Sequence, residues 1–472
     1  MRTLHPRVVA WLSALPIAVL GAATATAVPA AAAGVTVVVM GQGSAAAVTS
    51  AGGTVLRSLP VVDGVAALLP RGASVPGHVV VPDSALHVAG ASTGGAASTS
   101  TVRQTLGLGN GSPTGAGTTV AVVDTGVADV PELAGRLTHV DVTGDGIGDG
   151  YGHGTFVAGL VAGTEVGVAP DAQVVDVKVG HNDGSTSLIE VLAGLQAVAD
   201  DPNVDVVNLS LSSGSPLDPS VDPLTIALDT LRASGMVVVV PAGNDGPSAG
   251  TVSSPGTDTN LLTVGGLDEN GTAVRKDDSV ASWSSRGGAG VPAPDFVAPG
   301  AHLISLGLPG SVIWNDNPSA RRDGNHFVGS GTSFSAAVVS GAAAVLLGAR
   351  PDLTAGQVDG LLHATAYNVR GPQSGTGAGG VDLGAALTAP AAAAGDGDLR
   401  SPHRRGQGAD FDANAWAARQ WAARQWAARQ WAARQWAARQ WAARQWAADD
   451  WAARQWSARQ WSARQWSDNG WE

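Results

Sequence analysis

Almost uninterrupted aliphatic runs alternate with helix-like runs through residues 102–390. Thr119-Val-Ala-Val-Val123 and Met236-Val-Val-Val-Val240 are strand-like, whereas 188–199 and 334–349 have helical length and composition. The other runs of these kinds are 174–179, 204–209 and 261–264 for strands, and 156–162 and 224–234 for helices. A strand without polar alternation is buried on both faces, and intervening helices supply parallel crossovers. The sequence therefore predicts an α/β fold with a mostly parallel sheet and helices on both faces.

Composition supports a buried core and excludes several classes of function. Hydrophobic residues make up 44% of the 472 residues and charged residues 14%, which excludes general disorder. The net charge of −12 argues against nucleic acid as the main partner. The absence of cysteine from the sequence excludes disulfides, thiol catalysis and thiolate metal sites.

The first 33 residues have the pattern of a secretory signal peptide. Arg2 and Arg7 give a positive start, Val8 to Leu20 is apolar, and small residues with A-x-A spacing follow. The alternative is a membrane anchor, but the apolar run is short for spanning a bilayer. We therefore expect a secreted protein with a leader at 1–33.

Residues 34–88 form a compact strand-rich segment, which predicts a small α+β unit. Its strand-like runs are 35–40, 53–59, 65–69 and 78–82. A Gly-, Ser- and Thr-rich stretch follows and reads as a flexible linker at 89–101.

The C-terminal part differs in composition from the rest of the chain. An Ala- and Gly-rich linker at 391–412 precedes a tail at 413–472, which repeats Trp-Ala-Ala-Arg-Gln with period five. The tail carries twelve of the 15 Trp residues. Period five places successive Trp on all sides of a helix and on alternating faces of a strand. Trp with Arg favours binding to an anionic cell envelope or self-association; the alternative is repeat expansion in the DNA without selected function.

Two short segments carry an acid and an imidazole in positions suited to a cleft. Asp124 ends a buried strand, at the edge where open α/β sheets place their sites. His153 lies between glycines at the start of an apolar helix. Taken singly, Asp124 could instead cap a helix or a turn, and His153 could be structural.

Two further segments offer an amide and a hydroxyl. Asn244 follows a strand, where its side chain could form a turn or donate to a developing oxyanion. Ser333 opens a helix rich in small residues, where a hydroxyl could cap the helix or act as a nucleophile near the positive end of the helix dipole.

Together, in the order Asp, His, Asn, Ser, these blocks resemble the subtilisin-like serine peptidases. The matching segments are Asp124-Thr-Gly, Gly152-His-Gly-Thr, Ala242-Gly-Asn and Gly331-Thr-Ser, and the resemblance covers about 102–390. The family usually has Met, Ala and then Pro after the nucleophile, where this chain has Phe334, Ser335 and Ala337. These differences affect helix packing rather than the reacting atoms.

The resemblance implies a role for each of the four residues. Ser333 would attack the scissile carbonyl, and His153 would take its proton and deliver it to the leaving amine. Asp124 would orient the imidazole. Asn244 and the Ser333 backbone N–H would bind the oxyanion.

By the same resemblance, two uncharged walls would line the substrate pocket. Ser210, Leu211 and Ser212 would form one wall, and Ala242 and Gly243 part of the other. No charge lies in these positions, which predicts a neutral pocket with a broad apolar preference.

The resemblance also gives residues 34–88 the role of an inhibitor-type prodomain that assists folding and blocks the cleft. Cleavage is expected between His87 and Val102. No cofactor is needed for the chemistry. A structural calcium ion is compatible with Glu132 and with the acidic loop at 141–149, although alternating Asp and Gly is equally typical of a solvated turn.

The sequence thus predicts a secreted serine endopeptidase that acts on proteins or peptides and is made as an autoprocessed precursor, with a tail that holds it at the cell envelope or mediates self-association. The alternative is a surface-binding or assembly protein that uses a peptidase-like domain, 102–390, as a scaffold.

Overall fold

The computed structural model describes residues 34–88, 101–215, 217–288 and 290–390. The predicted signal peptide, nearly all of the first linker, the second linker and the Trp-rich tail lie outside the described residues.

In the described part of the chain, an eight-stranded sheet forms the centre of the larger unit. The strand order is β14–β13–β12–β10–β6–β8–β7, and β15 also pairs with β13. Its strands are β6 (Thr119–Asp124), β7 (Leu137–Asp141), β8 (Gln173–Lys178), β10 (Val206–Leu209), β12 (Val237–Pro241), β13 (Leu262–Asp268), β14 (Ser279–Val280) and β15 (Phe296–Pro299). All pairs are parallel except β13 with β14. The predicted mostly parallel sheet is confirmed.

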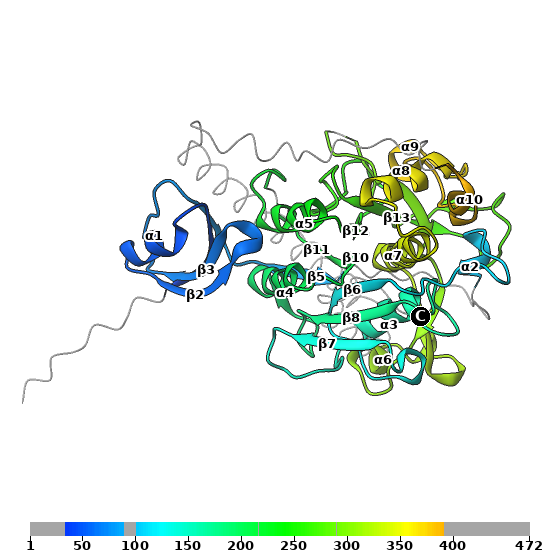
Figure 1. Cartoon of the computed structure of the whole chain (residues 1–472), viewed down its shortest axis with the longest axis horizontal. Coiled ribbons are helices and arrows are strands. Elements are labelled where there is room, and N and C mark those ends of the chain that lie inside the picture. The colour runs from blue at the N-terminus through cyan, green and yellow to red at the C-terminus, as the bar shows by residue number, and fades with distance from the viewer. Residues whose placement is uncertain (1–33, 89–100, 216, 289, 391–472) are drawn as a thin grey trace, which may run out of the picture.

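Helices cover both faces of this sheet, which explains the lack of polar alternation in its strands (Figure 1). In β12, Val237 and Val239 join the core under α3 (His153–Ala162) and α7 (Thr332–Ala349). Val238 and Val240 join the core under α4 (Leu188–Asp200) and α5 (Pro223–Ala233). The remaining helices are α1 (Ser44–Ser50), α2 (Val102–Thr105), α6 (Val312–Asp316), α8 (Ala355–Thr365), α9 (Gln373–Thr376) and α10 (Leu383–Thr388).

Helix α7 is the most apolar long element of the described chain. It is the one described helix whose length and hydropathy would suit a membrane span, but 83% of it is buried inside the protein. Its composition is therefore that of a central core helix.

Residues 34–88 form a separate small unit beside the larger one. It contains β1 (Val35–Met40), β2 (Thr54–Leu59), the 3-10 turn η1 (Pro60–Val62), β3 (Gly64–Leu69) and β4 (Val79–Pro82). Its sheet is antiparallel, in the order β2–β3–β1–β4, with α1 between β1 and β2. These strands lie where the sequence predicted them.

The small unit packs on α4 and α5, as Figure 1 shows. Val61 and Val62 of η1 are buried in the same hydrophobic cluster as the inner faces of both helices, and the Val61 N–H donates to Gln196 Oε1 at 2.7 Å. Two backbone N–H groups in the first turn of α4 also donate hydrogen bonds to oxygens of the small unit. Leu188 N donates to the Ser84 carbonyl and Ile189 N to the Asp83 carboxylate. Burial raises the pKa of Asp83, while the bond from Ile189 opposes that rise.

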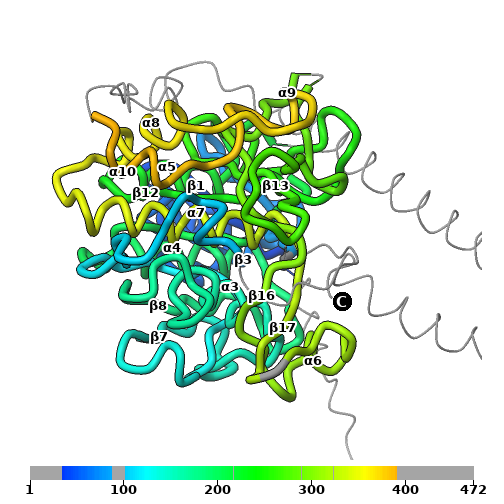
Figure 2. Tube along the Cα trace, turned by 90° about the vertical axis from the view of Figure 1, so that its right-hand side faces the viewer, coloured from blue at the N-terminus to red at the C-terminus, as the bar shows by residue number. Residues whose placement is uncertain are grey.

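The end of the small unit enters the larger one as an added strand. β5 (Ala85–Val88) lies between β9 (Thr186–Ser187) and β11 (Leu211–Ser212), antiparallel to both. Val88 pairs with Leu211, and Leu86 pairs with Thr186. An antiparallel ribbon, β16 (Leu303–Leu306) with β17 (His326–Gly329), leads towards α7 and packs beside α3 (Figure 2).

Candidate active site

A buried carboxylate holds the imidazole of His153. Asp124 is the last residue of β6 and His153 the first of α3, and both are almost fully buried. His153 Nδ1 lies 2.8 Å from Asp124 Oδ1 and 3.0 Å from Oδ2. Because an ionised carboxylate only accepts, Nδ1 carries the proton, and the neutral ring then keeps its basic lone pair on Nε2.

Glycines allow the Asp124 turn and the His153 helix to approach this closely. A Cβ on Gly154 would lie 2.1 Å from the Gly126 carbonyl oxygen. Gly126 has φ +106°, and a Cβ there would lie 2.3 Å from the Gly148 carbonyl oxygen. Both positions therefore require glycine, as expected where two backbones meet.

A second buried acid fixes the same two segments. Asp149 Oδ1 accepts from Thr125 Oγ1 at 3.0 Å and from Gly152 N at 2.6 Å. Its Oδ2 accepts from the backbone and side chain of Thr155, at 2.9 and 2.8 Å. Asp149 thus caps the start of α3 and ties it to the residue that follows Asp124. Burial raises the pKa of Asp149, which makes its four donors essential to its charged form.

Ser333 is the second residue of α7. Its Oγ donates to the Ser210 carbonyl oxygen at 3.2 Å. The residue before the helix is Gly331, so Ser333 is not the N-cap. Phe334, the next residue, packs the start of α7 against α3. Its ring centroid lies 5.4 Å from that of His153 and 4.4 Å from that of Phe156.

The side-chain amide of Asn244 is oriented by the residue before Ser333. Asn244 Oδ1 accepts from both Thr332 N and Thr332 Oγ1, each at 3.0 Å. Thr332 Oγ1 in turn accepts from Gly243 N at 3.2 Å. With its oxygen committed in this way, the amide presents its NH₂ group away from Thr332. An amide so fixed is suited to donating to a negative oxygen.

One wall of the predicted substrate pocket is a strand that already has a partner. Leu211 and Ser212 form β11 and pair with Val88 and His87 of β5. The side chain of Ser210 is fixed by two hydrogen bonds: its Oγ accepts from Asn208 Nδ2 at 2.8 Å and donates to the Ser333 carbonyl at 3.2 Å. Asn208 Oδ1 accepts from Ser340 of α7 at 3.0 Å, which completes a buried polar chain.

The other predicted wall consists of buried small residues. Ala242 and Gly243 follow β12, and Gly243 has φ +102°. A Cβ on Gly243 would lie 2.8 Å from Ser253 Oγ and 3.0 Å from Ser285 Oγ, so only glycine fits between them. Ser253 Oγ is buried and has no hydrogen-bond partner among the described residues. The surroundings of Gly243 are thus polar but uncharged.

The sequence matches a known family over the region that contains this site. The profile of the Subtilase family matches residues 115–394, which is more than half of the chain. This chain belongs to the subtilase family. The fold agrees, since the solved structure of fervidolysin from Fervidobacterium pennivorans, described as a keratinolytic enzyme related to subtilisin, superposes with a TM-score of 0.61. That match covers 76% of this chain and 61% of fervidolysin, at 26% identity.

Curated relatives are similar over the same region. Serine protease AprX of Bacillus subtilis is 40% identical over 270 residues, which are 53% of this chain and 61% of AprX. Subtilisin Savinase of Lederbergia lenta is 35% identical over 262 residues, which are 54% of this chain and 86% of that protein. The chain thus spans less than two thirds of the length of AprX and most of the length of Savinase.

In this subtilase, the helix that carries Ser333 accommodates the residues that differ from the usual family pattern. Phe334 is fully buried against His153 and Phe156. Ser335 Oγ donates to the Ala298 carbonyl at 3.0 Å, so its extra hydroxyl is satisfied. With Ala337 in place of Pro, α7 runs without interruption from Thr332 to Ala349. All three residues are thus accommodated within one unbroken helix.

The acidic loop of the subtilase does not gather its carboxylates at one point. Asp141 accepts from the backbone N–H groups of Thr143, Gly144 and Gly146 within the loop itself. Asp145 pairs with Asn182 N and His181, and Asp149 is buried under α3 as described above. Among the described residues, the one group of three potential metal ligands that converges is Glu132 with Glu165 and His326.

Several positioning residues were not singled out from the sequence. Thr332 stands inside a matched motif, and Asp149 ends the acidic loop three residues before another, so a count of polar side chains near each motif could have suggested both. Asn208 and Ser340 lie 132 residues apart, and no local signal connects them. A buried ammonium also supports the site, since Lys178 Nζ donates to the Thr125 and Gly148 carbonyls and to Asn182 Oδ1.

Proposed function

We propose that this chain is a secreted serine endopeptidase whose catalytic residues are Ser333, His153 and Asp124, with Asn244 as an oxyanion donor. The observation that carries this proposal is the two-oxygen contact from Asp124 to His153 Nδ1, at 2.8 and 3.0 Å, beside the helix start that bears Ser333. A buried acid, an oriented imidazole and a hydroxyl at a helix N-terminus are the parts that acyl transfer needs.

In the proposed reaction, Ser333 Oγ attacks the scissile carbonyl carbon while His153 Nε2 accepts the hydroxyl proton. Asp124 stays ionised and stabilises the imidazolium. The carbonyl electron pair moves to the oxygen, which is met by the Asn244 NH₂ group and the Ser333 backbone N–H. Collapse of this intermediate breaks the C–N bond as the imidazolium protonates the leaving amine. A water molecule then repeats the sequence to release the acid and restore Ser333.

We propose that the chain is made as a precursor in which 1–33 is a signal peptide and 34–88 an inhibitor-like prodomain. Support comes from β5, which adds a strand between β9 and β11 as an extended peptide ligand would. Its described end, Val88, pairs with Leu211, and the next residue of that wall, Ser210, accepts from the Ser333 hydroxyl. The scissile bond is therefore proposed to follow closely after Val88.

The same strand suggests a substrate preference. Leu86 is 1% exposed and packs in the cluster that contains Leu188 and Leu211, whereas its neighbours Ala85 and His87 are exposed. We propose that substrates place an aliphatic side chain in the position of Leu86. The neutral surroundings of Gly243 favour an uncharged residue next to the scissile bond.

The localisation and the tail are proposed from the sequence. The leader favours secretion, and the basic Trp-rich tail at 413–472 favours retention at an anionic envelope or self-association. Sedimentation with purified cell wall, with and without 413–472, tests retention; equal sedimentation of both forms contradicts it. We also propose a structural metal ion at Glu132 rather than in the acidic loop, because the carboxylates of that loop do not converge.

Fluorophosphonate labelling of the purified, processed protein tests the proposed activity. We expect one label per chain, kept in the matched control Ser335→Ala, whose hydroxyl lies in the same helix turn but bonds to Ala298. Ser333→Ala should give no label even after added trypsin has removed its uncut 34–88 segment. Equal labelling of the Ser333→Ala variant would reject Ser333 as nucleophile. Failure of the unmodified chain to label or to cleave casein would favour a peptidase-like binding scaffold instead.

N-terminal sequencing of the secreted product tests the precursor proposal separately. We expect a new N-terminus shortly after Val88, and an uncut precursor for Ser333→Ala. A mature N-terminus at residue 34 would contradict the assignment of 34–88 as a removed prodomain.

A further inference from the structure

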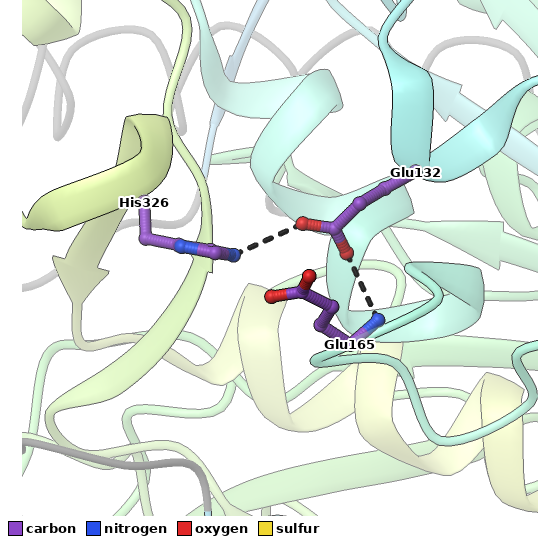
Figure 3. A group of neighbouring side chains, drawn as sticks. All are labelled: Glu132, Glu165 and His326. Atoms are coloured by element: carbon purple, nitrogen blue, oxygen red, sulfur yellow. Dashed lines mark hydrogen bonds and ion pairs between the residues drawn. The ribbon is translucent and has the colours of Figure 1, made fainter.

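The group formed by Glu132, Glu165 and His326 brings together two carboxylates and one imidazole from distant parts of the chain (Figure 3). His326 Nε2 lies 3.0 Å from Glu132 Oε1, and Glu165 N donates to Glu132 Oε2 at 3.1 Å. One potential ligand atom from each side chain lies within 4.8 Å of the others. In Figure 3 the three side chains point toward a common space.

We propose that this group binds a zinc ion. Imidazole nitrogen with carboxylate oxygen suits first-row transition metals, and three protein ligands with one open position form a common zinc site. Calcium prefers six to eight oxygen ligands, and an imidazole in the set argues against it. The proposal therefore differs from the calcium expectation at Glu132 in both metal and ligands.

The separations are compatible with zinc after a small movement. Two ligand atoms on a tetrahedral zinc ion, with bonds of about 2.0–2.2 Å, lie roughly 3.3 Å apart. The observed 3.0 Å between His326 Nε2 and Glu132 Oε1 is close to that value. The Glu165 side chain is exposed and needs to approach by at most about 1.5 Å from the 4.8 Å limit.

One guanidinium near the group, that of Arg136, attracts the Glu132 carboxylate electrostatically, but its hydrogen bonds go to other oxygens. The nearby guanidinium of Arg136 donates to the backbone carbonyls of Glu132, Ala162 and Ala172 and to Thr164 Oγ1. Gly163 gives Glu132 room, since a Cβ there would lie 3.1 Å from Glu132 Oε2. Two carboxylates brought this close repel each other unless a positive charge lies between them.

A second histidine that contacts two acids, His181, has a different geometry. His181 contacts Asp145 through Nδ1 and Glu190 through Nε2, at 3.1 and 2.7 Å. The two acids therefore lie on opposite sides of the ring and cannot share one ion with it. The imidazole of His326 instead faces Glu132 through Nε2, on the side where Glu165 also lies.

The proposed ion would join the three segments that carry the candidate triad. Glu132 follows the strand that ends in Asp124, Glu165 follows the helix that begins with His153, and His326 begins β17, which leads to α7. Helix α3 has ten residues, or about 15 Å, so the ion would lie a helix length from His153. Its role would be to stabilise the fold, and the proposal holds whether or not the chain is a peptidase.

Metal binding to the full-length Ser333→Ala protein, purified without a histidine tag and freed of metal with a chelator, tests the proposal. We expect calorimetry with zinc chloride to give one site per chain, and cobalt(II) to give the intense visible absorption of a four-coordinate site. Glu165→Gln and His326→Gln should each weaken zinc binding at least tenfold and abolish the zinc-dependent rise in Tm. Glu165 is exposed, so its variant should fold normally.

The matched control is His181→Gln, which removes a histidine flanked by two acids but should leave zinc affinity unchanged. Loss of zinc binding in this variant alone, or no zinc binding by the parent protein, would overturn the proposal. Calcium binding that needs Glu132 but is unaffected by His326→Gln would also overturn it in favour of a calcium site.

Discussion

The hydroxyl of Thr332 offers a direct test of how the candidate oxyanion site works. It donates to Asn244 Oδ1 at 3.0 Å and accepts from Gly243 N at 3.2 Å, so it fixes both the amide and the backbone beside it. Thr332→Val removes the oxygen and keeps the shape of the side chain. Asn244 Oδ1 then retains one bond, from the backbone N–H of residue 332.

The expected fall in kcat follows from the one hydrogen bond to Asn244 that the substitution removes. Loss of one neutral hydrogen bond that orients the amide corresponds to about 1–1.5 kcal/mol, or roughly a five- to tenfold fall in kcat. Asn244→Ala removes the donor itself, and the removal of a single oxyanion donor from a subtilisin costs about 10²–10³ in kcat. KM should change little in either variant, because both act on the transition state.

A double-mutant cycle distinguishes orientation of the amide from a separate contribution. If Thr332 acts through Asn244, Thr332→Val should reduce kcat less than about twofold in the Asn244→Ala background. Rates are measured on a chromogenic peptide with an aliphatic residue at the Leu86 position, and Tm is measured in parallel. Thr365→Val is the control, since its hydroxyl donates to the backbone carbonyls of Leu361 and Asp382, which are not part of the candidate site. Fully additive losses would refute the reasoning.

Three further predictions concern other buried groups. Asp149→Asn should lower the free energy of unfolding by about 1–3 kcal/mol, because an NH₂ group would face backbone donors from Gly152 or Thr155; an unchanged Tm would contradict this. Burial raises the pKa of Glu269 to about 7 from an ordinary 4.5, so the folded protein favours the protonated carboxyl. The stability that this group contributes is therefore fully present below pH 4.5 and is lost as the pH rises through about 7. Glu269→Gln should remove that loss and raise stability at pH 8 by about 3 kcal/mol, as judged by urea unfolding of the Ser333→Ala protein at several pH values. Leu86→Ala, which empties a site 1% exposed, should weaken docking of 34–88 by about 2–5 kcal/mol and speed its digestion by added trypsin in the Ser333→Ala precursor.

The fold was largely predictable because its strongest determinant is local. Val237 to Val240 alternate between the two cores of the sheet, and the absence of polar residues in that run already indicates burial on both faces. Each predicted strand needed no knowledge of its partners. The order of the strands in the sheet could not be predicted in this way, because nothing within β6 indicates that β10 and β8 are its neighbours.

The candidate site was predictable where a motif carries its own geometry. The glycines beside Asp124 and His153 mark a close backbone approach, and Gly126 and Gly154 meet as that pattern predicts. β5 was not predicted, because Ala85–Val88 is a strand only through pairing with residues more than a hundred positions away. The convergence of Glu132, Glu165 and His326 escaped prediction for the same reason.

The order of the strands explains why four individually weak motifs form one site. Asp124, Ser210 and Asn244 lie at or just beyond the carboxyl ends of β6, β10 and β12. These strands are adjacent in the sheet, so two strand spacings, about 10 Å, separate positions that are 120 residues apart in sequence. α3 and α7 begin at this same edge, which brings His153 and Ser333 to it in the first turns of their helices. A peptide that adds a strand beside β11, as β5 does, would therefore pass close to Ser333. We accordingly expect residues 85–88 to exclude a substrate from that edge for as long as they stay paired with β11.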